Sequence, residues 1–124
     1  MQKTMTCTAT KAFWIAIIVG LFSLVNIQAA SAHPPKDVSI SYDLAQQTLS
    51  VTITHKTTFT STHYIESVTI IKNGTALSTE EYTEQPKEKP FTYTYQVPAA
   101  AGDVLEVKAT CRIFGSKEAK ITVE

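Results

Sequence analysis

Apolar and polar residues alternate along most of the chain between Val38 and Val123, and this pattern constrains the fold most. Leu49, Val51 and Ile53, for example, are separated by single Ser and Thr residues. A repeat of two residues is typical of strands with one buried face and one solvated face, whereas an amphipathic helix repeats every 3.6 residues. The pattern therefore predicts an all-β domain without a helical segment.

Seven segments share the alternation, and turn signals separate them. Asn73-Gly74 is a strong hairpin signal, residues 85–90 form a charged loop bounded by prolines, and residues 99–103 end in Gly-Asp. The expected strands cover residues 38–42, 48–55, 63–72, 76–82, 91–97, 105–111 and 119–123. About seven short antiparallel strands at this spacing predict an immunoglobulin-like β-sandwich.

The N-terminal segment has the features of a signal peptide. Lys3 and Lys11 precede an apolar run over residues 13–25, and Ala-Ser-Ala follows at residues 30–32. A membrane anchor is the alternative, but spanning a bilayer takes about 20 apolar residues, and this run is shorter. We expect cleavage after residue 32, a secreted or extracytoplasmic domain over residues 33–124, and no membrane span in the mature protein.

The mature segment is long enough for one modest core of about ninety residues, and not for two domains. Lys3 and Lys11 leave with the signal peptide, so acidic residues outnumber basic ones, and no basic run suggests nucleic-acid binding. No serine-hydrolase elbow, phosphate loop or His-Glu-x-x-His motif is present. Asn73-Gly74-Thr75 also matches a glycosylation sequon, although a turn alone explains it.

One cysteine and three histidines carry what chemistry the mature segment offers. Cys7 would leave with the signal peptide, so Cys111 would have no second cysteine in the mature segment and would be a free thiol, an intermolecular bridge or a metal ligand. His33 opens the segment, His63 opens the third expected strand, and both His55 and Cys111 continue the apolar faces of theirs. Sulfur and imidazole nitrogen together suit a transition metal. Two surface histidines and a buried, inert cysteine are the alternative interpretation.

Part of this pattern resembles the iron-binding domain of desulfoferrodoxin and neelaredoxin, the superoxide reductases. The resemblance covers about residues 36–123 and depends on His55, on His63-Tyr64-Ile65, and on a late Cys-x-x-x-Gly. It implies an immunoglobulin-like sandwich, with iron held by four histidines in a plane and by an axial cysteine thiolate. It also implies that superoxide binds at the sixth position and is reduced to peroxide, with an electron donor that the sequence does not identify.

Carried over to this chain, the resemblance implies His33, His55, His63 and Cys111 as metal ligands. Phe114 stands where the family has its fourth histidine, and Lys56 follows His55 where the family has proline. Phe offers no lone pair, so at most three imidazoles and one thiolate remain. Such a set suits four-coordinate zinc as well as iron.

Two further hypotheses use the same residues differently. Cleavage before His33 would create an N-terminal histidine whose amine and imidazole chelate copper together with another imidazole, independently of Cys111. A metal-free binding or structural module, alone or as a homo-oligomer, is the other hypothesis. Tyr82, Tyr93 and Tyr95 could serve its contacts, but cross-strand pairing explains them more simply.

Overall fold

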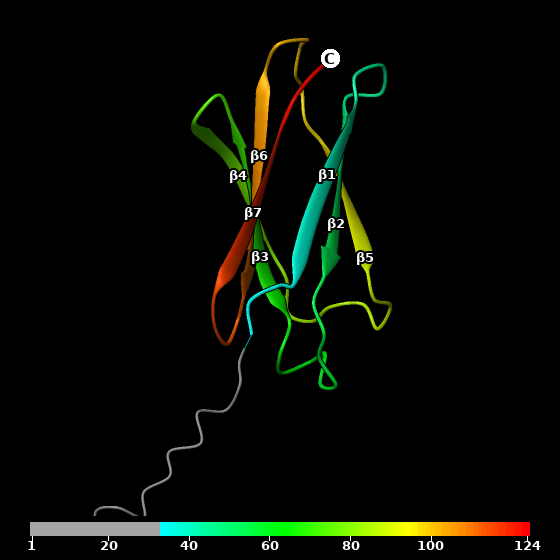
Figure 1. The fold of residues 1–124 in the computed structure, drawn as a ribbon, viewed down its shortest axis with the longest axis vertical. Coiled ribbons are helices and arrows are strands. Elements are labelled where there is room, and N and C mark those ends of the chain that lie inside the picture. Colours follow the sequence, from blue (N-terminus) through cyan, green and yellow to red (C-terminus); the bar gives the residue numbers. More distant parts are fainter. Residues whose placement is uncertain (1–32) are drawn as a thin grey trace, which may run out of the picture. The chain divides into compact units, whose positions relative to one another are not determined.

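Seven antiparallel strands make up the part of the chain that the computed structural model describes, residues 33–124 (Figure 1). The predicted signal peptide, residues 1–32, lies outside the described residues. The strands are β1 (Asp37–Asp43), β2 (Thr48–Thr54), β3 (Ile65–Lys72), β4 (Thr75–Glu81), β5 (Phe91–Gln96), β6 (Val104–Cys111) and β7 (Ser116–Thr122). Each corresponds to an expected strand, although β3 begins two residues after His63 and β7 begins three residues before Ala119.

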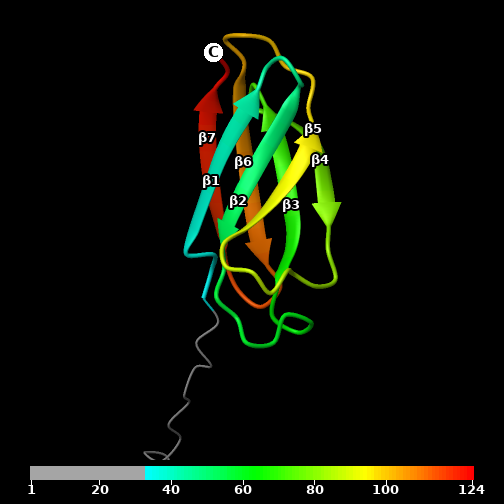
Figure 2. The same ribbon diagram turned by 90° about the vertical axis from the view of Figure 1, so that its right-hand side faces the viewer.

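Two sheets pack face to face, which confirms the predicted sandwich (Figure 2). One sheet has the order β1-β2-β5 and the other has the order β4-β3-β6-β7. The hairpin between β3 and β4 turns at Asn73 and Gly74, whose φ angles of 51° and 81° are the positive values that such a turn requires. Because of this tight hairpin, β4 extends the sheet of β3 as an edge strand.

Alternate residues of the central strands fill the space between the sheets. In β2 and β6 every second side chain is buried, and Leu49, Ile53 and Leu105 have no exposed surface. The buried core consists of Val38, Leu49, Val51, Ile53, Ile65, Val68, Ile70, Phe91, Val97, Leu105, Val107, Ala109, Cys111 and Val123. Burial of this apolar surface is the main force that holds the two sheets together.

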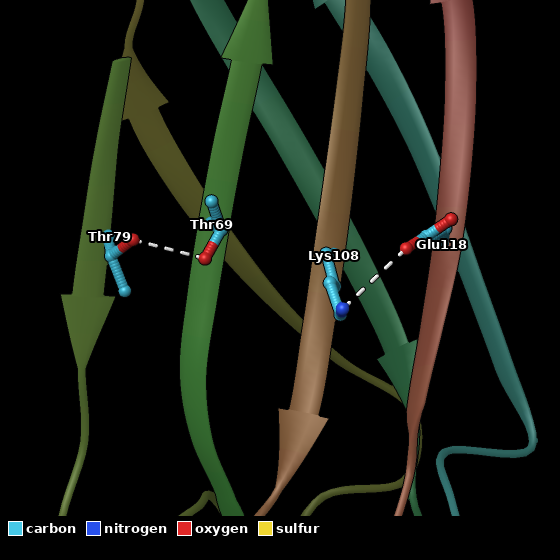
Figure 3. Close-up of polar contacts among 4 residues, drawn as sticks. All are labelled: Thr69, Thr79, Lys108 and Glu118. Carbon is cyan, nitrogen blue, oxygen red and sulfur yellow. Dashed lines mark hydrogen bonds and ion pairs between the residues drawn. The ribbon is translucent and has the colours of Figure 1, made fainter. Parts of the chain in front are cut away.

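Polar pairs cover the outer face of the larger sheet (Figure 3). The hydroxyls of Thr69 and Thr79 lie 3.0 Å apart across β3 and β4, and Lys108 Nζ lies 3.9 Å from a Glu118 carboxylate oxygen across β6 and β7. Exposed ion pairs of this kind add little stability. Every residue of β4 is exposed, and its glutamates place charge on a sheet edge that could otherwise pair with another chain.

One end of the sandwich collects all the predicted site residues. Because successive strands run in opposite directions, residues 33–36, 55–64, 82–90 and 112–115 meet at the lower end of the views (Figures 1 and 2). We call these four segments the site end. Within residues 33–124 no helix is long and apolar enough to cross a membrane.

Candidate metal centre

Three predicted ligands come together at the site end. One ligand atom from each of His55, His63 and Cys111 can be chosen so that all three lie within 4.8 Å of one another. His55 directly follows β2, where the alternation that buries Ile53 also turns its side chain inward. Cys111 ends β6 on the same side as Ala109, and His63 lies in the loop before β3. A set of two nitrogens and one sulfur suits a transition metal, and calcium or magnesium would need oxygen ligands.

Two imidazole nitrogens in this group make no hydrogen bond within the described residues. His55 is 1% exposed and Cys111 is 3% exposed. Among the described residues, His55 Nε2 and His63 Nε2 are buried side-chain nitrogens that make no hydrogen bond. A buried polar atom without a partner costs about 1–3 kcal/mol. A metal ion bound to both nitrogens would remove this cost, so the residues present fit such an ion.

The two imidazole rings of His55 and His63 lie at an angle to each other. Their ring centroids lie 4.8 Å apart with the ring planes at 82°. Burial lowers the pKa of His63 below its usual value, and the charges of His55 and His33 lower it further. A metal binds the neutral form of imidazole, so these surroundings favour the form of His63 that can act as a ligand.

Backbone hydrogen bonds connect the loop that carries His63 with the end of β6, where Cys111 lies. The His63 amide donates to the Phe59 carbonyl at 2.8 Å and closes a turn within the first loop. The Arg112 amide donates to the Tyr64 carbonyl at 3.0 Å, which joins the residue after Cys111 to the residue after His63. The relative position of the two ligands therefore depends on main-chain bonds as well as on side-chain packing.

His33, the fourth predicted ligand, is not part of the three-residue group. It is exposed and lines a cleft of about 480 Å³ that also reaches His55, and its charge contributes to the lowered pKa of His63. The cleft is lined by His33, Pro34, Pro35, Lys36, His55, Lys56 and Lys117. Ligation by His33 therefore remains a prediction, and of the three grouped residues only His55 shares the lining of the cleft with it.

Phe114 is 65% exposed, and its neighbour Ile113 is 53% exposed. Both belong to the loop between β6 and β7, so the aromatic ring at position 114 is not packed into the centre. The correspondence between this position and the family's fourth histidine remains a prediction. Within residues 33–124, no further histidine or cysteine joins the group of three.

Gln85 is the residue that the sequence analysis missed. It lies in the predicted charged loop, yet it is only 4% exposed and its Oε1 lies 2.7 Å from His55 Nδ1. Metal-binding histidines are usually oriented by such a bond at the second ring nitrogen. Thirty residues separate the two side chains in the chain. Periodicity and motif spacing carried no signal of their contact.

Comparisons with known proteins find similarity only in structure. No protein-family model and no curated protein matches the sequence. A solved structure of superoxide reductase (neelaredoxin) from Ignicoccus hospitalis is 18% identical, covers 78% of this chain and 86% of its own, and gives a TM-score of 0.48. A second structure of the same protein is also 18% identical, and its match covers 74% of this chain and 81% of its own chain, with a TM-score of 0.45. At this distance the likeness concerns the arrangement of the strands, and evidence for a metal centre comes from the side chains of this chain.

Proposed function

We propose that residues 33–124 form an exported domain that binds one transition-metal ion through His55 Nε2, His63 Nε2 and Cys111 Sγ. The ion, iron by the resemblance to superoxide reductases, would exchange one electron with a small oxidant such as superoxide. The observation that carries this proposal is the pair of buried Nε2 atoms without partners, in a group with a buried thiol.

The donor set favours a redox role over a structural one. Structural zinc sites are closed by four protein ligands, and the group found here supplies three. A thiolate ligand pushes electron density onto the metal, as in haem–thiolate centres. With His55, His63 and Cys111 as its ligands, the ion would keep a position open for a small molecule, and His33 lines the cleft that reaches His55.

The cleft favours an anionic substrate. Lys36, Lys56 and Lys117 line it, and none of the described residues in its lining is acidic. Clefts lined by charge of one sign concentrate oppositely charged substrates and accelerate their encounter. Superoxide carries one negative charge, and with one electron and two protons it becomes hydrogen peroxide. The electron would come from the reduced metal, which an external donor would then reduce again.

A rapid-mixing experiment tests this function. Iron-loaded and reduced protein is mixed with superoxide, and oxidation of the centre is followed through its thiolate-to-iron absorption band. We expect one equivalent of peroxide for each centre oxidised, and loss of the band in Cys111→Ser. Lys56→Gln should slow the reaction, whereas Lys72→Gln, at the opposite end of the sandwich, should not.

This experiment, together with a copper-binding measurement, distinguishes the other hypotheses. A centre that binds iron with a thiolate band but does not react with superoxide would refute the proposed substrate and retain the metal site. Copper binding that is indifferent to Cys111→Ser, and lost when a residue is added before His33, would support the N-terminal copper site instead.

A further inference from the structure

We propose that Gln85 is the positioning residue of the metal centre, because it fixes which nitrogen of His55 faces the metal. This inference rests on the proposed metal site, since a tautomer has functional meaning only if Nε2 is a ligand. Gln85 belongs to the segment between β4 and β5, which contributes none of the three ligands.

Two backbone groups determine how the Gln85 amide is oriented. The Ile65 N–H donates to Gln85 Oε1 at 3.1 Å, and the side-chain Nε2 of Gln85 donates to the His55 carbonyl at 3.0 Å. A backbone N–H can only donate and a carbonyl can only accept. Exchanging the oxygen and nitrogen of the side-chain amide would therefore break both hydrogen bonds at once, so the orientation with Oε1 toward Ile65 is the one that satisfies its neighbours.

This orientation in turn determines the tautomer of His55. Gln85 Oε1 is an acceptor, so the ring nitrogen 2.7 Å away, Nδ1, must carry the proton. In a neutral imidazole the other nitrogen then has a free lone pair. That nitrogen is Nε2, the buried atom without a hydrogen-bond partner, and His55 is the residue grouped with His63 and Cys111.

Gln85 also connects the segments that carry ligands. Its side chain forms hydrogen bonds with His55, just after β2, and with Ile65 at the start of β3. The backbone N–H of Gln85 donates to the Thr60 carbonyl at 3.2 Å. The loop with His63 lies between these anchor points. A neutral amide orients the imidazole without adding a negative charge beside the site, so the metal would receive a neutral ligand with a defined direction.

A leucine substitution tests the proposal, with a matched control at the other end of the sandwich. Gln85→Leu keeps a similar volume and removes the acceptor. The side chain of Gln47 likewise donates to the Ala99 carbonyl and accepts from the Ala99 N–H. Gln47→Leu therefore removes comparable side-chain-to-backbone hydrogen bonds away from the site. Removing a residue that orients a metal ligand typically weakens metal binding by about 10–100-fold. We expect this loss of iron affinity in Gln85→Leu and none in Gln47→Leu.

A measurement on the metal-free protein separates positioning from a general effect on the fold. Nitrogen NMR of the histidine rings, at a pH where they are neutral, reports which nitrogen carries the proton. We expect the Nδ1–H form of His55 in the wild type and in Gln47→Leu, and a mixture or the Nε2–H form in Gln85→Leu. Gln85→Glu retains an acceptor opposite Nδ1 and should preserve the Nδ1–H form.

The possible results have distinct meanings. The Nε2–H form in the wild type would overturn the inference, even if Gln85→Leu failed to fold. An unchanged tautomer and unchanged iron affinity in folded Gln85→Leu would overturn it as well. Wild-type protein with the Nδ1–H form that binds no metal would instead refute the proposed function and leave only a structural role for Gln85.

Discussion

Gly115 lies directly against Pro34, so that a Cβ atom on residue 115 would stand 2.8 Å from the Pro34 Cβ. This contact seats the segment of His33 on the loop that follows Cys111. The Lys36 amide, which donates to the Thr54 carbonyl at 2.8 Å, continues the attachment. The lining of the cleft beside the candidate metal site therefore depends on a residue without a side chain.

We predict that Gly115→Ala loosens the His33 segment, and Gly74→Ala is the matched control. Both glycines have positive φ angles, 80° and 81°, where a non-glycine residue costs about 1–2 kcal/mol. Only position 115 has a neighbour in the way, since nothing lies within 4 Å of a Cβ at position 74. Hydrogen exchange at the Lys36 amide should accelerate in Gly115→Ala alone. Equal exchange rates in the two variants would contradict the role of the Pro34 contact.

The centre of the sandwich should be sensitive to truncation. Leu105 is fully buried, so Leu105→Ala should lower the free energy of unfolding by about 2–5 kcal/mol. Leu77 on the edge strand is 47% exposed, and Leu77→Ala should change the free energy of unfolding by less than about 0.5 kcal/mol. Urea unfolding of both variants checks this. Similar losses would mean that β4 is covered in the native protein.

Tyr93 should make stability depend on alkaline pH. Burial, followed by the charges of Tyr82 and Glu84, raises its pKa from 10.0 to about 12. A pKa that is higher in the folded than in the unfolded state stabilises the fold fully below pH 10, and this stability is lost as the pH rises toward 12. Chemical unfolding at several alkaline pH values should show the loss, with a smaller slope in Tyr93→Phe. Identical slopes would refute the assignment to Tyr93.

Both burial and bound metal should protect the Cys111 thiol from chemical modification. Because the residue is 3% exposed, a thiol reagent should react slowly with the metal-free native protein and rapidly after denaturation. Bound metal should slow the native reaction further, since the thiolate would then be a ligand. Rapid reaction of the native protein, unaffected by metal, would contradict the proposed ligand role.

The sequence predicted the strands well because their alternation reflects directly which face is buried. Leu49, Val51 and Ile53 have the same inward parity in the sequence and in the sandwich. The same parity indicated that His55 and Cys111 point inward, and it therefore anticipated two of the three residues in the candidate centre.

The remainder of the site depends on loops, where no periodicity constrains the side chains. The neighbours of Gln85 in the sequence are charged residues and proline, yet its side chain is buried because its amide forms hydrogen bonds with the backbone groups of His55 and Ile65. That match arises only once three segments meet. The position of His33 likewise depends on the Pro34–Gly115 contact, which links residues far apart in the chain.

Metal content tests the central claim most directly. The mature protein, purified without an affinity tag, is analysed for iron, copper and zinc alongside Cys111→Ser and the control Ser41→Ala on β1. We predict one transition-metal ion per chain in the wild type and the control, with iron as the metal, and a large loss in Cys111→Ser. No stoichiometric metal in the wild type after reconstitution, or metal retained fully in Cys111→Ser, would contradict a centre built on His55, His63 and Cys111.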